Sequence, residues 1–280
     1  MGDPKECALS VMQEESPAGG DQLGLVAAPG QKRPPSPRRA QVWRALREIV
    51  LVGLLFLAYK LGRVAADGHV AEAMANAREV WHLERVLHLP SEYGLQRAAV
   101  SHEWLIKLAN CYYAYVHFPV TAACLVWMWI KRPEHYVRTR RMLAWLTATA
   151  LVVHLLMPLA PPRMLDAMGM VDTGELFGPE VYGSPTHDTL TNQYAAMPSL
   201  HVGWALAVAI ALMAATRTRW RRLWLLHPLV TLLVVVVTGN HYWLDAIVAT
   251  VLLSVVIVLQ NGWRPAPVAV PRPRMSGAES

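Results

Sequence analysis

Residues 223–259 read LWLLHPLVTLLVVVVTGNHYWLDAIVATVLLSVVIVL, and this stretch decides the fold class. It contains two long apolar runs, 223–238 and 242–259, which are separated only by a short polar turn. Each run approaches the roughly 20 residues that a helix needs to cross the hydrocarbon core of a bilayer. The stretch therefore predicts two membrane-spanning helices that are joined by a tight turn.

The rest of the chain follows the same pattern. The sequence is 54% hydrophobic and only 16% charged, whereas a soluble domain carries about a quarter charged residues. Three further apolar runs lie near residues 109–130, 142–159 and 199–215. A shorter run at 49–59 becomes long enough if the basic side chains that flank it reach toward the lipid head groups. We therefore predict an all-α, polytopic membrane protein with six transmembrane helices.

The run at 49–59 has a second interpretation as the core of a signal peptide, because the small residues Ala65 and Ala66 follow it. The charged region that precedes it is longer than such peptides carry, which favours a retained helix. Both interpretations place the following segment outside the cytoplasm.

Polar segments flank the membrane domain, which we expect to cover residues 41–262. Residues 1–40 and 263–280 lack apolar periodicity and predict disordered tails. We expect the basic tail at 1–40 to set the membrane topology or to contact anionic lipid, and not to bind nucleic acid. Between the first two spans, residues 70–108 predict two amphipathic helices that lie at the membrane surface.

The basic residues of the short loops predict the orientation. Residues 131–141 and 216–222 contain five and four Lys or Arg residues, whereas the long loop 160–198 contains only Arg163. Because Lys and Arg accumulate on the cytoplasmic side, we expect this long loop outside and both termini inside. Arg outnumbers Lys, and Ala and Val are abundant, which is typical of a GC-rich bacterial genome. We therefore expect a bacterial plasma membrane.

Four polar residues are expected to meet at the outer ends of these spans. They are Arg163, His201, His241 and Asp245. His241 and Asp245 are four residues apart, so one helix face brings them into contact. The carboxylate can then hold Nδ1 of the imidazole and leave Nε2 as a nucleophile or base. A structural ion pair between helices is the alternative.

The surroundings of His201 indicate an anion site. Pro198 and Ser199 predict a helix start, where free backbone N–H groups bind anions. Arg163 adds a permanently charged donor fork suited to phosphate. Alternatively, His201 is a packing residue. Together with the two histidines, Arg163 and the helix start favour a phosphate substrate. Ser199, Asn240 and Tyr194 are also expected to contact this substrate.

Two segments together resemble the type 2 phosphatidic acid phosphatase superfamily. Residues 198–201 (PSLH) and residues 241–245 (HYWLD) are similar to its second and third signature blocks. Residues 161–163 (PPR) and 239–245 (GNHYWLD) are more similar to its inositol phosphorylceramide synthase branch. The likeness extends over about residues 43–260 and includes the six-span layout.

The resemblance implies a mechanism. It implies that His241 attacks phosphorus to form a phosphohistidine and that Asp245 orients it. It further implies that His201 protonates the leaving alcohol, while Arg163 binds the phosphoryl oxygens. The substrate would be a lipid phosphoester, the acceptor a lipid or polyol alcohol or water, and no metal or other cofactor would be needed.

The sequence departs from the phosphatase branch directly before His241. Thr238, Gly239 and Asn240 stand where that branch carries an Arg. One phosphate-binding cation is therefore missing, which favours a phosphotransferase over a simple lipid phosphate phosphatase. A transporter or flippase with a His-Asp proton relay, or a membrane scaffold, are alternatives from other classes. The gathering of polar residues at one membrane face and the lack of an inverted repeat argue against a transporter.

Overall fold

The computed structural model describes residues 42, 43, 45–54, 57, 69–179 and 193–262. The chain divides into two compact units, residues 1–48 and 49–280, and the elements below belong to the second. Across the described residues the fold is helical, with one isolated parallel bridge between Leu159 and Ala195. The all-α prediction is therefore confirmed for this part of the chain. The predicted tails lie outside the described residues.

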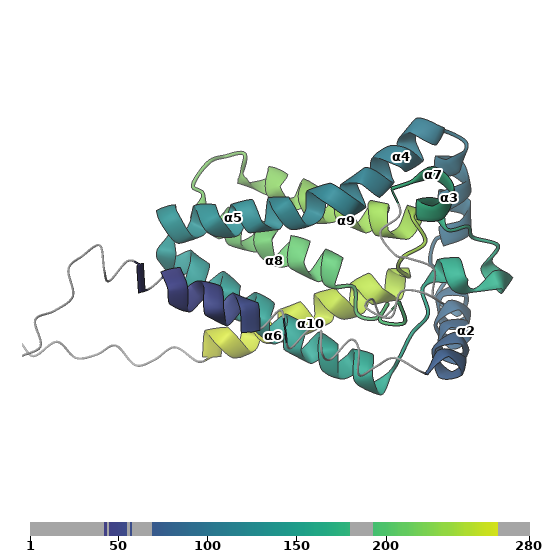
Figure 1. The fold of residues 1–280 in the computed structure, drawn as a ribbon, viewed down its shortest axis with the longest axis horizontal. Helices are drawn as coiled ribbons and strands as arrows, with labels where there is room; N and C mark the ends of the chain where they lie inside the picture. The colour runs from purple at the N-terminus through teal and green to yellow at the C-terminus, as the bar shows by residue number, and fades with distance from the viewer. Residues whose placement is uncertain (1–41, 44, 55–56, 58–68, 180–192, 263–280) are drawn as a thin grey trace, which may run out of the picture. The chain divides into compact units, whose positions relative to one another are not determined.

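A bundle of five helices forms the body of the second unit (Figure 1). The helices are α5 (His117–Lys131), α6 (Pro133–Leu156), α8 (Leu200–Ala215), α9 (Leu226–Val237) and α10 (Trp243–Gly262). Helix α8 contacts each of the other four. At Gly203 an added Cβ would lie 2.9 Å from Cδ2 of Leu146, so a side chain there would force Leu146 to shift, and the glycine favours the close packing of α8 on α6.

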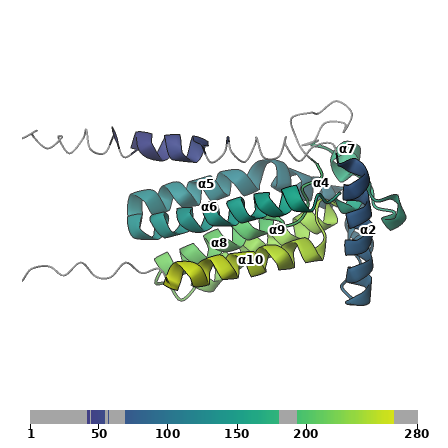
Figure 2. The same ribbon diagram turned by 90° about the horizontal axis from the view of Figure 1, so that it is seen from below.

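Three further helices gather at one end of the bundle. They are α2 (Val70–Val86), α3 (Glu92–Val100) and α4 (Glu103–Cys111). Helix α2 lies across the bundle end in both views (Figures 1 and 2). Its face with Ala73, Ala77 and Val80 is buried against the loops that follow α6 and precede α8. The expected helix after residue 70 is therefore present, with an apolar stripe at helical spacing.

The second predicted surface helix differs from the prediction. Residues 103–111 do not form a separate amphipathic helix, because α4 continues through a π-helical turn at Tyr112–Val116 into α5. The π-turn lies just before Pro119, which has no N–H to donate to the carbonyl one turn back, and such turns accommodate that loss. The surface element that follows α2 is instead the short helix α3.

Two helices of the described residues are long and apolar enough to cross a membrane. They are the continuous helix Glu103–Lys131, with 29 residues, and Trp243–Gln260, with 18 residues. Helix α8 is apolar but has only 16 residues. In the predicted first span, residues 49–54 and 57 are helical. The described residues thus contain two candidate membrane spans, while the full six-span layout stays a prediction.

Candidate active site

His241 and Asp245 meet at the start of α10, although they do not share a helix as predicted. Helix α10 begins at Trp243, and the Asp245 side chain reaches back from its first turn. Its Oδ2 lies 3.1 Å from Nδ1 of His241 and accepts the backbone N–H of Tyr242 at 2.9 Å. The second contact is half of a capping box, which satisfies an N–H that the helix leaves unpaired. One carboxylate therefore fixes the helix start and the imidazole together.

A glycine turn brings Arg163 to the same place. Gly239 ends α9 with φ +68°, in the left-handed region that favours glycine. An added Cβ there would lie 3.0 Å from Cβ of Arg163 and 3.3 Å from Nε2 of Gln96. The backbone N–H of Arg163 donates to the Gly239 carbonyl at 3.0 Å. The absence of a side chain at 239 therefore lets the Arg163 loop pack onto the turn before His241.

The Arg163 guanidinium is held by three side chains. Its Nε donates to Oδ2 of Asp172 at 2.8 Å, and Nη2 donates to Oε1 of Gln193 at 3.0 Å. Its Nη1 donates to Oδ1 of Asn240, whose amide donates in turn to Thr238. The Arg163 side chain is only 4% exposed. The fork is therefore aimed by its neighbours, and a carboxylate offsets part of its charge.

His201 lies in the first turn of α8 and is surrounded by rings. Its ring centroid lies 4.6 Å from that of Tyr113 and 5.3 Å from that of Phe118. The His241 ring is 5.9 Å away, centroid to centroid. Two backbones hold this spacing, because the Ser199 N–H donates to the Asp245 carbonyl at 3.1 Å and so joins the starts of α8 and α10.

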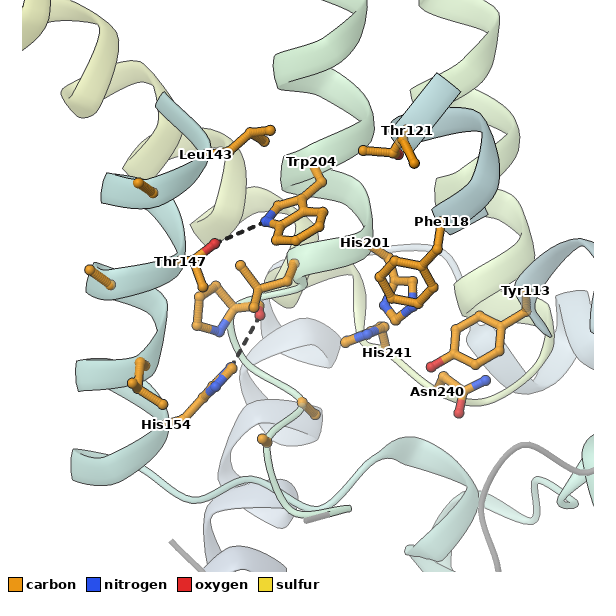
Figure 3. Close-up of a pocket in the computed structure, with 18 of the residues that line it drawn as sticks. Tyr113, Phe118, Thr121, Leu143, Thr147, His154, His201, Trp204, Asn240 and His241 are labelled. Atoms are coloured by element: carbon orange, nitrogen blue, oxygen red, sulfur yellow. Dashed lines mark hydrogen bonds between the residues drawn. The ribbon is translucent and has the colours of Figure 1, made fainter. Parts of the chain in front are cut away.

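These groups open onto one cavity of about 610 Å³ (Figure 3). Arg163, Asn240, His201 and His241 all line it, and it extends between α5, α6 and α8. This volume lies within the range of sites that bind small organic molecules. Three of the four residues that were expected to meet, Arg163, His201 and His241, therefore line one cavity. The fourth, Asp245, does not line it and contacts it only through His241.

Two predicted contact residues lie elsewhere. The Ser199 hydroxyl accepts the N–H of Val202 at 3.4 Å and caps α8, and Ser199 is absent from the cavity lining. Tyr194 packs against the cluster around Ala73, and its carbonyl accepts the Leu159 N–H at 2.7 Å. In this arrangement both residues shape the site from behind.

Several residues that shape the site were not singled out from the sequence. Asp172 and Gln193 orient Arg163, and Gln96 joins the backbone at Val171 to the end of α9. Asp172 could have been found, because it precedes Thr-Gly-Glu175 in the pattern of a helix N-cap, and it caps the short helix Thr173–Phe177. Gln96 and Gln193 carry no such local pattern.

A pair of buried glutamates supports the start of α10. Glu84 of α2 and Glu92 of α3 are each 2% exposed. Oε1 of Glu84 accepts the Leu244 N–H at 2.8 Å. Burial, together with the hydrogen bond to Glu92, raises the pKa of Glu84 from 4.5 to about 9. The sequence contained a signal, since Glu84 continues the helical spacing of Ala77 and Val80 on the buried face of α2.

No group of three or more His, Cys, Asp or Glu side chains that could hold a metal ion occurs among the residues that the structure describes. Metal independence itself stays a prediction.

Comparison with known proteins gives one match. The model of one protein family, described as the PAP2 superfamily, matches residues 78–259, which is well over half of the chain. The matched range contains Arg163, His201, His241 and Asp245. No curated protein and no solved structure matches the chain.

Proposed function

We propose that this chain, which belongs to the PAP2 superfamily, is an integral-membrane lipid phosphotransferase of the inositol phosphorylceramide synthase type. The proposal proceeds from the family, whose members are phosphatases or phosphotransferases that act on lipid phosphoesters. The donor is a phosphodiester lipid, and the acceptor is a lipid or polyol alcohol. The observation that carries the proposal is the pair His201 and His241, which face one cavity beside Arg163.

The chemistry runs in two balanced halves. Nε2 of His241 attacks phosphorus while Nδ1–H donates to Asp245, and the bond to the leaving oxygen breaks as His201 protonates that oxygen. In the second half, His201 takes the proton of the acceptor hydroxyl, whose oxygen bonds to phosphorus as the P–N bond breaks. Arg163 stabilises the charge of the equatorial oxygens. The ring separation of 5.9 Å supports this division of roles.

The charge of the site favours a phosphodiester donor. Asp172 lies 2.8 Å from Nε of Arg163 and offsets its charge, and no cation precedes His241 in Thr238-Gly239-Asn240. A phosphomonoester carries nearly two negative charges at neutral pH, whereas a phosphodiester carries one. In a partly dry site one unpaired charge can cost several kcal/mol, which is enough to select between these substrates.

The test compares initial rates on a phosphomonoester lipid and a phosphodiester lipid with the same chains, in one detergent, with inositol or a lipid alcohol titrated. We expect faster cleavage of the diester, and a further increase when the correct alcohol is present. Faster hydrolysis of the monoester, unaffected by any alcohol, would identify a simple lipid phosphate phosphatase and overturn the proposal.

Asp172→Asn provides a matched variant for this assay. It removes the charge that offsets Arg163 and keeps an oxygen that can accept from Nε. We expect the preference for the diester over the monoester to fall about threefold to tenfold, because the site becomes more cationic. An unchanged preference would show that Asp172 does not set the charge of the phosphoryl site.

The proposal also places the active site on the extracytoplasmic face of a bacterial plasma membrane, within six spans and with both termini in the cytoplasm. The support is the distribution of Lys and Arg over the short loops. A cysteine introduced at the exposed position 167 should react with an impermeant thiol reagent in intact cells, and one introduced at the exposed position 134 should not. The reverse labelling would place the site in the cytoplasm.

A further inference from the structure

The lining of the cavity changes in steps along its length (Figure 3). His201 and Phe118 lie at the end where the phosphoryl chemistry is proposed. Trp204 follows His201 by three residues on α8, so it lies about 4.5 Å farther along the helix. Thr121 likewise follows Phe118 on α5. The next lining residues are therefore one helical turn farther from the site.

One helical turn from His201 the lining of the cavity is polar, and one turn farther it is apolar. Thr147 of α6 lies across from Trp204, and its Oγ1 accepts the indole N–H at 3.1 Å (Figure 3). Leu125, four residues after Thr121, and Leu143, four residues before Thr147, line the cavity one turn farther from the site. The order from the site outward is imidazole, then hydroxyl and indole, then aliphatic side chains.

Thr121 differs from other threonines of the bundle. The hydroxyls of Thr139, Thr231 and Thr250 each donate to the carbonyl four residues earlier at 2.8 Å, which is the usual arrangement in a helix. Thr121 is only 2% exposed, and its Oγ1 has no hydrogen-bond partner among the described residues. A buried hydroxyl without a partner is costly, so this one is matched to an acceptor that comes with a ligand.

Both hydroxyls can serve a ligand in the cavity. Thr121 lines it, and a rotation about χ1, which has two accessible wells for Thr in a helix, exchanges its methyl and hydroxyl groups. The Thr147 oxygen already accepts from Trp204, and its hydroxyl proton can be donated to the cavity. Two potential donors, one on α5 and one on α6, thus line the cavity about one helical turn from the imidazoles, and a ligand there must present acceptors.

We propose that this step of the cavity recognises the carbonyl oxygens of ester or amide linkages that join the chains of the lipid to its head group. Thr121 and Thr147 donate to these oxygens, and the chains lie against Leu125 and Leu143. The inference rests on the proposed function, because it places the phosphorus of the same lipid at His241. An isoprenoid phosphate has only hydrocarbon beyond its phosphate and would leave both hydroxyls without an acceptor.

The test uses the purified full chain with three phosphoinositol lipids of equal chain length. One is ester-linked, one is its ether-linked analogue without carbonyls, and one is amide-linked. We expect kcat/KM to be about threefold to tenfold higher for the ester or the amide than for the ether, mainly through KM, as for the loss of one or two hydrogen bonds. Which of the two carbonyl lipids binds more tightly distinguishes the two linkages.

Thr121→Val keeps the shape of the side chain and removes its hydroxyl. We expect this variant to lose the part of the preference for carbonyl lipids that Thr121 supplies, while Thr147 keeps the rest, and to treat the ether-linked lipid as the parent does. Thr250→Val, whose parent hydroxyl bonds its own helix, is the control and should change neither. Equal KM values for ester and ether in the parent, or an equal loss on both lipids in Thr121→Val, would overturn the inference and leave a purely structural hydroxyl.

A binding measurement separates this inference from the proposed function. If none of the three lipids is turned over, the proposed function fails. The occupancy of ester-linked against ether-linked lipid, measured by native mass spectrometry of the parent and of Thr121→Val, still decides the inference. Equal occupancy by both lipids in the parent contradicts it.

Discussion

The two helix starts that carry the histidines are built differently. At the start of α10, His241 is held by a hydrogen bond to Asp245, which also binds the backbone at Tyr242. At the start of α8, His201 lies among the rings of Tyr113 and Phe118. The hydrogen bond to Asp245 fixes the direction of the His241 ring, and the surrounding rings fix the position of His201. In the proposed mechanism, the first arrangement suits a nucleophile that must point at phosphorus, and the second keeps the acid beside it.

Removal of either histidine is expected to have the largest effect. His241→Ala and His201→Ala should each lower turnover by about a thousandfold or more, because one loses the nucleophile and the other the acid. The double variant should be scarcely slower than either single variant, since the two act as a unit. Turnover on the proposed diester donor provides the measurement. A folded His241→Ala protein with the parent rate would refute the mechanism.

The hydrogen-bonded side of the comparison is broken by Asp245→Asn. The Asn oxygen can still accept the Tyr242 N–H, so the helix start should persist, while the imidazole loses its anionic partner. We expect kcat to fall about a hundredfold to a thousandfold with little change in the apparent unfolding temperature. A large loss of stability with an unchanged rate per folded molecule would instead assign Asp245 a structural role.

Phe118→Leu tests the ring packing around His201 at the start of α8. The ring centroid of Phe118 lies 5.3 Å from that of His201, and a smaller side chain frees the imidazole to tilt. We expect kcat to fall about threefold to tenfold, the range of one lost aromatic contact, while KM changes less. A rise in KM alone, with kcat unchanged, would indicate that Phe118 contacts only the lipid.

The smallest effect is expected at Glu84, which supports the α10 start from α2. Its pKa is raised from 4.5 to about 9, so the folded protein holds this proton more tightly than the unfolded chain. Its contribution to stability is complete below pH 4.5 and is lost as the pH rises toward about 9.

Glu84→Gln cannot ionise and keeps an oxygen for the Leu244 N–H. We expect its apparent unfolding temperature to fall less between pH 5 and pH 9 than that of the parent. Glu72→Gln, an exposed position of the same helix, is the control. Parallel pH profiles for parent and Glu84→Gln would show that the raised pKa of Glu84 does not contribute to the pH dependence of stability.

The parts of the fold and site that the sequence predicts are those with a local signal. Long apolar runs predict α8, α9 and α10, and the spacing of four residues predicts the contact between His241 and Asp245. The start of α10 was misplaced by about two residues, because the turn at Gly239 places His241 before the helix and the Asp245 side chain reaches back to it. The pairing survived because both arrangements bring the two side chains together.

The remaining parts depend on contacts between distant segments. The Glu84 carboxyl meets Leu244, which is 160 residues away, and Gln96 meets Val237 across 141 residues. No periodicity within one helix encodes such partners, since they follow from how the helices pack. The charge pairing of Arg163 with Asp172 is closer in sequence, but its geometry depends on the 3-10 turns between them.

The backbone hydrogen bond from the Ser199 N–H to the Asp245 carbonyl joins the two helix starts that carry the histidines, so hydrogen exchange of this one amide reports on their separation. Ser199 is fully buried, so its N–H can exchange with solvent deuterons only when the starts of α8 and α10 separate. Its exchange rate therefore measures how often the site opens. Its donor and acceptor are both backbone atoms, so no side-chain substitution at 199 or 245 removes either of them.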